Sequence, residues 1–348
     1  MDLSVMFFGT EESHAGAGKY DDIIAIARTA DELDFTAVWT PERHFQQFGQ
    51  VFPNPAVLGA ALAAVTSRIA IRAGSLVLPL HHPLRVVEDW SVIDNLSRGR
   101  VGVSLATGWH ATDFVLAPEK YEHRKAQTRA DVALLRRLWA GEAVELPDGT
   151  GRLVAVRPQP RPVSARLPLW LTSSGSEETW VAAGRLRTNV LAATVGQARD
   201  ELARKIELYR EAYAAAPEQP GAAEHGVVTL MAHTYVGASD AEVLDRVRAP
   251  LTAYLRSYVK QTASNRGGDG RTAGLTDQQL TDLAGYALRK YLDWGSLLGG
   301  PETCARTLAD LHELGCDEVA CFVDFGLGRE DLLAGLHRLA ELRKDRTA

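Results

Sequence analysis

Short apolar runs alternate with amphipathic helical patterns along most of this chain, and that alternation constrains its fold more than any other feature. The predicted strands occupy residues 3–8, 35–40, 69–78, 101–105, 168–172, 189–192, 227–236 and 317–323. The predicted helices occupy residues 21–33, 55–66, 84–96, 126–139, 176–184, 197–214, 240–258 and 332–342. Eight strands separated by helices in a chain of 348 residues predict an α/β fold of the (β/α)8 TIM barrel type. An open doubly wound sheet is the alternative, but Gly9, Gly16 and Gly18 lack its GxGxxG spacing.

Two segments interrupt the repeat. We expect a single barrel domain over residues 1–348 with insertions at approximately 141–166 and 259–300. The first is rich in Pro, Gly and Arg and predicts extra loop or hairpin structure before the fifth strand. The second contains a polar, glycine-rich stretch, 262–277, and a loop of this length is typical of a functional lid or a disordered segment.

Composition argues against several classes of partner. The chain has 38 Lys and Arg against 44 Asp and Glu, with no basic stripe, so we expect no nucleic-acid partner. No apolar run approaches the roughly 18 residues of a membrane helix, and the N-terminus does not resemble a signal peptide. Cys304, Cys316 and Cys321 lack CxxC spacing, so we expect reduced, structural cysteines in a cytoplasmic protein.

Polar residues follow the predicted strands at their carboxyl ends, where barrel enzymes place their active sites. The second strand ends at Pro41 and opens into Glu42, Arg43 and His44. The residues that follow the third and fourth strands include His81, His82, Thr107, Trp109, His110 and Asp113. A single histidine here could be a solvated loop residue, but four histidines on one rim favour a functional site.

The stretch TSSGSEET, residues 172–179, leads from the fifth strand into a helix. Backbone amides and the helix dipole at such a terminus bind phosphate without a positive side chain. The same letters also fit a serine helix cap with glutamates in the first turn. The candidate cofactor-binding residues are Ser173, Ser174, Gly175, Ser176 and Thr179.

Several long motifs resemble one protein family in order and spacing. These are VWTPERHFQQFG at 38–49, SLVLPLHHPLRVVEDWSVIDNLSRGRVGVSLATGW at 75–109 and TSSGSEETW at 172–180. Together they resemble the bacterial luciferase-like, flavin-dependent monooxygenases, and residues 299–326 are similar to the closing helix–strand unit of that superfamily. The chain is most similar to the natural-product biosynthesis branch, which is often found beside nonribosomal peptide and polyketide assembly lines.

The resemblance implies an oxidoreductase that uses FMN and O2. FMNH2 would come from a separate flavin reductase, a transient partner, and would react with O2 to give a flavin C4a-peroxide. The implied product is a hydroxylated small molecule or carrier-protein-tethered intermediate in natural-product biosynthesis. Proteins of this family commonly pair, so the resemblance also implies a homodimer.

The resemblance assigns roles to particular residues. His44 falls on the catalytic histidine of the family, expected to stabilise the peroxyflavin or move protons, and Glu42 is its neighbour in the motif. His82 completes our catalytic set, while His81 and His110 are further candidates. The implied cofactor contacts are a non-prolyl cis peptide between Gly74 and Ser75 under the flavin ring, then Thr107 and Trp109, and a phosphate-binding turn at Ser174, Gly175 and Ser176.

The sequence departs from the luciferases at two positions. Arg43 stands where luciferases have a second histidine, which argues against light emission. Thr107 stands where they have an arginine for the flavin phosphate. The phosphate charge would then be met by helix-terminus amides alone or by an arginine that the sequence does not place.

Three other functions remain open at the level of the sequence. The same scaffold carries hydride transfer with the deazaflavin F420, which uses no oxygen. Other relatives bind flavin without turnover, although His44 argues against that function. A metal-dependent barrel hydrolase would usually show HxH on its first strand, which here reads LSVMFF, so we expect no metal site.

Overall fold

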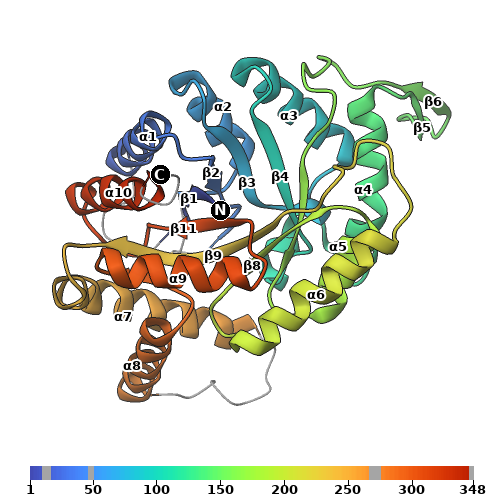
Figure 1. Ribbon diagram of the computed structural model, residues 1–348. Helices are drawn as coiled ribbons and strands as arrows, with labels where there is room; N and C mark the ends of the chain where they lie inside the picture. The colour runs from blue at the N-terminus through green and yellow to red at the C-terminus, as the bar shows by residue number, and fades with distance from the viewer. Residues whose placement is uncertain (10–16, 46–50, 266–275, 345–348) are drawn as a thin grey trace.

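The computed structural model describes residues 1–9, 17–45, 51–265 and 276–344, and its parallel strands close into a barrel (Figure 1). β8 and β11 both pair with β9, and β11 pairs with β1, which joins the two ends of the sheet. The barrel strands are β1 (Asp2–Met6), β2 (Ala37–Thr40), β3 (Ala70–Val77), β4 (Val101–Ala106), β7 (Leu169–Ser173), β8 (Asn189–Ala193), β9 (Val228–Val236) and β11 (Glu318–Phe322). Each of the eight predicted strands is present, and the TIM barrel is confirmed.

Helices cover the outside of the barrel and bury their apolar faces against the strands (Figure 1). They are α1 (Ala17–Glu32), α2 (Pro55–Val65), α3 (Pro83–Ser97), α4 (Arg124–Ala140), α5 (Glu177–Arg185), α6 (Arg199–Ala215), α7 (Asp240–Asn265), α9 (Pro301–Glu313) and α10 (Arg329–Lys344). The start of α2 shows the local cause of such an element. Asn54 caps it by accepting the amides of Ala56 and Val57, and Pro55 occupies the first turn, where its missing N–H leaves no bond unmade.

The barrel interior contains an ion pair enclosed by aromatic rings. Arg72 donates to both carboxylate oxygens of Glu318, at 3.0 and 2.8 Å. Its guanidinium lies 4.9 Å from the ring centroid of Trp39 and 4.6 Å from that of Trp170. Ser4 and Trp39 also donate to Glu318, so this buried carboxylate is satisfied from several sides. The interior is therefore filled rather than open, and any ligand site must lie at an end of the barrel.

Structure beyond the repeat lies at the two predicted insertions. β5 (Val144–Pro147) and β6 (Leu153–Val156) form an antiparallel hairpin beyond α4, within the stretch 141–166 where extra loop or hairpin structure was expected (Figure 1). In the second insertion, α7 continues past the predicted end at residue 258, and the glycine-rich stretch proposed as a lid falls largely at 266–275, outside the described residues.

Two further elements were not predicted. β10 (Leu297–Gly299) is only three residues long and pairs with β9. α8 (Asp277–Asp293) packs its buried residues Ala284 and Leu288 against an apolar face of α7. It begins with a capping box between Thr276 and Gln279, a signal that the neighbouring glycines obscured.

Other structural observations bear on the sequence-based expectations. Cys304, Cys316 and Cys321 are buried free thiols, which confirms the prediction of reduced, structural cysteines. Burial raises the pKa of the Cys304 and Cys321 thiols to about 12, so both stay protonated and unreactive. In the part of the chain described here, no helix combines the length and apolar character needed to cross a membrane.

Candidate active site at the carboxyl end of the barrel

Glu42 is the buried centre of a polar cluster at the carboxyl ends of β2 and β3. The strand ends at Pro41, and the Glu42 amide then donates to the carbonyl of Ser75, at 3.1 Å. The next amide, that of Arg43, donates to the carbonyl of Phe52, at 2.8 Å. These backbone bonds turn the segment inward, so the Glu42 side chain lies under the rim rather than in solvent.

The Glu42 carboxylate accepts three hydrogen bonds. Its Oε1 accepts from Nε2 of His44, at 2.8 Å, and from Nε2 of His81, at 2.7 Å. Its Oε2 accepts from the amide of Val77, at 2.6 Å. Because an ionised carboxylate has no proton to donate, both histidines carry a hydrogen on Nε2. Each neutral imidazole therefore keeps Nδ1 as its acceptor, and the carboxylate fixes both tautomers.

The electrostatics of this cluster favour the charged forms of Glu42 and His44. Burial alone would raise the pKa of Glu42, but the bonds from His44, His81 and Val77 together lower it below 4.5. Burial alone would lower the pKa of His44, but the Glu42 carboxylate and the charge of Asp113 together raise it above 6.5. An imidazole with a raised pKa is well suited to proton transfer near neutral pH.

Asp113 adds a second buried carboxyl group to the cluster. It lies in a short 3₁₀ helix, Ala111–Leu116, that follows β4. Burial raises its pKa to about 6, a rise that His44 and Arg43 oppose and that Glu42 reinforces. Its Oδ1 has no hydrogen-bond partner among the described residues. Asp113 therefore changes charge in the same pH range as an ordinary histidine, although its chemistry is that of an acid.

Arg43 places a positive charge on an aromatic surface at the same rim. Its guanidinium carbon lies 3.8 Å above the Phe8 ring and 5.8 Å from the Trp109 ring. Trp109 is partly exposed, and its ring centroid lies 3.9 Å from that of the buried His110. The arginine thus cannot replace the second histidine of the luciferases as a proton carrier at neutral pH, because a guanidinium stays charged.

The peptide bond between Gly74 and Ser75 is cis, as the family resemblance implied. A Cβ atom at Gly74 would lie 2.9 Å from Cε of Met6 and 3.0 Å from Cβ of Trp39, so the position has no room for a larger residue. Ser75 hydrogen-bonds to Thr172, whose hydroxyl lies 2.7 Å from that of Ser104. This row of hydroxyls joins β3, β4 and β7 beside the Glu42 cluster.

The predicted phosphate turn joins β7 to α5. Gly175 has φ +127°, a conformation that favours glycine, and its amide donates to the hydroxyl of Ser173, at 3.3 Å. Ser176 is the N-cap residue of α5, but its side chain makes no capping bond, and Thr179 donates its amide to the Ser176 carbonyl. The turn therefore retains a free hydroxyl at a helix N-terminus, although Glu177 and Glu178 in the first turn oppose an anion.

The chain that forms this barrel and this cluster matches a known protein family. Residues 1–318 match the family described as luciferase-like monooxygenase. This chain belongs to the luciferase-like monooxygenase family. It is accordingly an oxidoreductase, a flavin-dependent monooxygenase of the luciferase-like type.

Curated relatives match this luciferase-like monooxygenase over most of its length. The oxygenase component of the flavin-dependent trigonelline monooxygenase of Acinetobacter baylyi is 25% identical over 335 residues, which cover 92% of this chain and 88% of that protein. The alkanal monooxygenase alpha chain of Photobacterium leiognathi is 29% identical over 303 residues, covering 81% of this chain and 80% of that protein.

Solved structures share the fold at lower identity. A monooxygenase from Streptomyces bottropensis superposes with a TM-score of 0.80 at 23% identity, with 100% of both chains covered. The oxygenating constituent of 3,6-diketocamphane monooxygenase from Pseudomonas putida, in complex with FMN, has a TM-score of 0.75 at 17% identity, covering 98% of this chain and 97% of that chain. An F420-dependent secondary alcohol dehydrogenase has a TM-score of 0.71 at 15% identity, covering 98% and 97%. The fold is therefore shared by flavin and deazaflavin enzymes.

The structure brings some predicted site residues together and separates others. Glu42 and His44 are in contact, but it is His81, not His82, that joins them. His82 is the N-cap residue of α3, and its Nδ1 accepts the amide of Leu84, at 3.2 Å. Thr107 lies at the end of β4 and is half-buried, one residue before Gly108. The sequence did indicate a capping role for His82, because the residue before a proline at the first helical position is the N-cap position.

Sequence reasoning missed Lys205 of α6, which approaches the phosphate turn. A Cβ atom placed on Gly175 would lie 3.9 Å from its Nζ. Lys205 is almost fully buried, and it donates to Gln197, at 2.8 Å, and to Glu201, at 2.5 Å. It lies on the buried face of α6 with Leu202, Ile206 and Tyr209. A lysine at a position of the apolar helical pattern was therefore the sequence signal that could have marked Lys205 as a buried, paired residue.

Proposed function

We propose that this chain is the oxygenase component of a two-component system that takes FMNH2 from a separate flavin reductase. The observation that carries the proposal is the contact of one buried carboxylate, Glu42, with both His44 and His81. When bound, the reduced flavin supplies the electrons with which O2 is activated. The enzyme transfers one oxygen atom to its substrate and releases the other as water.

The residues at the mouth suit a flavin mononucleotide. The Gly74–Ser75 peptide offers the ring a backbone surface with no side chain at Gly74, and Thr107 and Trp109 follow the neighbouring strand β4. The turn at 174–176 offers amides and a hydroxyl to the phosphate, and Lys205, although paired with Glu201, is the cation that lies beside it. The FMN bound in the Pseudomonas putida structure supports this choice of cofactor, whereas the F420-dependent neighbour keeps the deazaflavin as the alternative.

His44 holds and moves the proton in this proposal. Its Nε2–H is committed to Glu42, so Nδ1 is the nitrogen that exchanges a proton with a reacting group. Glu42 links His44 to His81, whose side chain is 26% exposed against 12% for His44. Glu42 thus holds Nε2 of both rings, which leaves Nδ1 of the less exposed His44 to take up or give the proton.

The substrate and setting follow from the family resemblance. We propose that a small molecule, free or tethered to a carrier protein, is hydroxylated in natural-product biosynthesis, and that the enzyme is a homodimer. The name of the Acinetobacter baylyi relative, an oxygenase component, supports the need for a reductase partner. The presence of His44 argues against the remaining alternative, a flavin-binding protein without turnover.

The test is an anaerobic titration with FMNH2 and with reduced F420, followed by mixing with O2. We expect tight binding of FMNH2 and delayed release of H2O2, with the delay shortened in His44→Ala. Lys205→Gln should weaken binding of FMN but not of riboflavin, which lacks the phosphate. Glu207→Gln, an exposed change on the same helix, is the control. Binding of F420 alone, or immediate release of H2O2 by the wild-type protein, would refute the proposal.

A further inference from the structure

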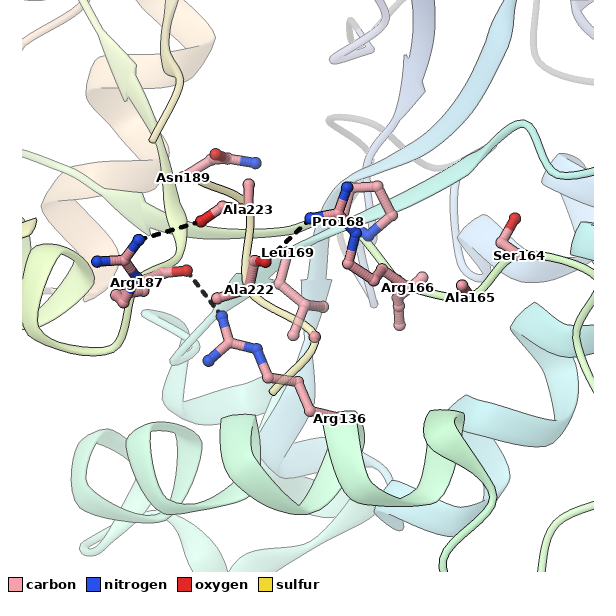
Figure 2. Close-up of a pocket in the computed structure, with 12 residues that line it drawn as sticks. Arg136, Ser164, Ala165, Arg166, Pro168, Leu169, Arg187, Asn189, Ala222 and Ala223 are labelled. Carbon is pink, nitrogen blue, oxygen red and sulfur yellow. Dashed lines mark hydrogen bonds between the residues drawn. The ribbon is translucent and has the colours of Figure 1, made fainter. Parts of the chain in front are cut away.

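A cleft of about 400 Å³ lies at the opposite end of the barrel from Glu42. It is formed where the chain enters β7, β8 and β9, and α4 closes one side (Figure 2). Its lining residues are Arg136, residues 164–169, Arg187, Asn189 and residues 221–223. Because β7 separates this cleft from the turn at 174–176, the two lie roughly 15 Å apart along the strand.

Three arginines face this cleft. Figure 2 shows Arg136 rising from α4 between Arg187 on one side and Arg166 on the other. Arg136 donates to the carbonyls of Leu186 and Arg187, at 2.8 and 2.7 Å, and to the side chain of Gln219. These acceptors orient the guanidinium without neutralising it.

The other two guanidiniums are held in the same way. Arg187 donates to main-chain carbonyls, including that of Ala223 at 3.4 Å, and Arg166 donates to the carbonyl of Ala222 at 3.0 Å. Within the described residues, no carboxylate forms an ion pair with any of the three arginines. Burial raises the pKa of the Tyr213 hydroxyl and the charges of all three arginines act to lower it, so the three side chains lie around the same tyrosine.

Several donors at the cleft have no acceptor. Nε of Arg136 and Nε of Arg187 are buried without a hydrogen-bond partner among the described residues, and Arg136 is only 7% exposed. The Oδ1 of Asn189 accepts the amide of Val227, at 2.9 Å, which leaves its NH2 group as a donor at the cleft. The two Nε atoms have no exposed surface, so an anion in the cleft would be attracted by the guanidinium charges rather than by a bond to these atoms.

The nearby acidic group is already engaged. Asp94 accepts from the amide of Ser164, at 2.8 Å, and from its hydroxyl, at 2.6 Å. Its carboxylate therefore satisfies Ser164 at the rim and leaves the arginines without a counter-ion. Burial and the neighbouring Arg187 lower the pKa of Arg136, as expected where like charges gather.

We propose that this cleft is a binding site for a small anion bearing a phosphate or carboxylate group, separate from the site at the barrel mouth. Planar guanidiniums bind such groups through paired, charge-assisted hydrogen bonds. The volume exceeds that of a single phosphate, so the anionic group would belong to a small metabolite. The site does not depend on the proposed function, because none of its residues lies near the Glu42 cluster.

The test is calorimetric titration of the full-length protein with inorganic phosphate and, separately, with succinate, at constant ionic strength. No FMN is added, because FMN itself bears a phosphate group and would compete for the cleft. We expect saturable binding of one anion per chain to one of the two probes. Arg166→Gln should weaken it about tenfold or more, because a charge-assisted bond is lost. Arg157→Gln, at an exposed arginine outside the cleft, should leave it unchanged.

Arg166 is chosen because it is exposed and makes a single bond to the chain, whereas Arg136 holds three acceptors and its loss could unfold the protein. Unchanged circular dichroism in Arg166→Gln establishes that the variant is folded. The proposal is overturned if neither probe binds saturably, or if Arg166→Gln binds as tightly as the wild type. The comparison of Arg166→Gln with Arg157→Gln separates the cleft from the turn at 174–176, and it decides the matter whether or not the protein binds FMN.

Discussion

Replacing Glu42 with glutamine removes one charge and almost no volume from the centre of the candidate active site. The carboxylate accepts from His44 and His81 on one oxygen and from Val77 on the other. An amide has a single oxygen, so it satisfies either the Val77 amide or the histidines, but not both. If its oxygen faces Val77, its NH2 group faces the two imidazoles, and both must change tautomer to accept.

The expected cost follows from these contacts. Each hydrogen bond to a buried charged group contributes about 1.5–3 kcal/mol, and removing one partner of a buried pair costs about 3–5 kcal/mol. Because glutamine keeps the bond to Val77, we expect Glu42→Gln to lower the free energy of unfolding by roughly 3 kcal/mol near pH 6. The pKa of His44 should fall, since burial continues to lower it and the opposing carboxylate is gone.

The pH dependence gives the sharper prediction. The pKa of Glu42 is lowered on folding, so its contribution is present above pH 4.5 and is lost as the pH falls through the lowered value. The pKa of His44 is raised, so its contribution is present below pH 6.5 and is lost as the pH rises through the raised value. The difference in stability between wild type and Glu42→Gln should therefore be largest between these limits.

Urea unfolding at a series of pH values measures the stability difference, and NMR titration of the histidine ring protons measures the pKa of His44. Glu207→Gln on α6 is the charge-matched control and should change neither quantity. A stability difference that does not vary with pH, or an unchanged His44 pKa in Glu42→Gln, would show that the carboxylate does not set the state of this histidine.

Two further substitutions test the buried charges. Ionising Asp113 costs roughly 3 kcal/mol in the fold, because its pKa rises from 3.8 to about 6 and each pKa unit is worth about 1.36 kcal/mol. Asp113→Asn should thus stabilise the protein by up to that amount at about pH 8, and not at all below its unfolded pKa, as urea unfolding will measure. Arg72→Met should destabilise the barrel by about 3–5 kcal/mol because it leaves Glu318 buried and unpaired. The double variant Arg72→Met/Glu318→Gln should recover most of that loss, and equal instability of the two variants would contradict this account.

The barrel was predictable because its strands are buried on both faces and their apolar runs are continuous. β9, for example, is buried at every position from Val228 to Val236. The elements that escaped prediction lack that signal. β10 has three residues and depends on its neighbour β9 for its hydrogen bonds, and α8 packs on α7 and, through Tyr291, on His233 of β9. Tertiary contact produces β10, whereas α8 combines such contact with a local capping box beside the glycine-rich stretch.

The site was predictable where its residues are close together in the sequence. Glu42 and His44 are two residues apart, so one motif contains both, whereas His81 is 39 residues from Glu42 and meets it only through the barrel. The choice between His81 and His82 depends on which side chain turns toward β2, and adjacent residues point in different directions. Lys205 escaped because it lies close to Gly175 only in the folded barrel, and Gly175 belongs to another βα unit.

The two ends of the barrel arrange charge in opposite ways, and the difference bears on what each can do. At the mouth, Glu42 and His44 carry opposite charges, and each moves the pKa of the other. A proton added to such a cluster is shared, which suits a site that must gain and lose protons during turnover. At the base, Arg136, Arg166 and Arg187 have one sign, and among the described residues no carboxylate forms an ion pair with them. Guanidiniums do not exchange protons at neutral pH, so that end can bind an anion but cannot act as an acid or base.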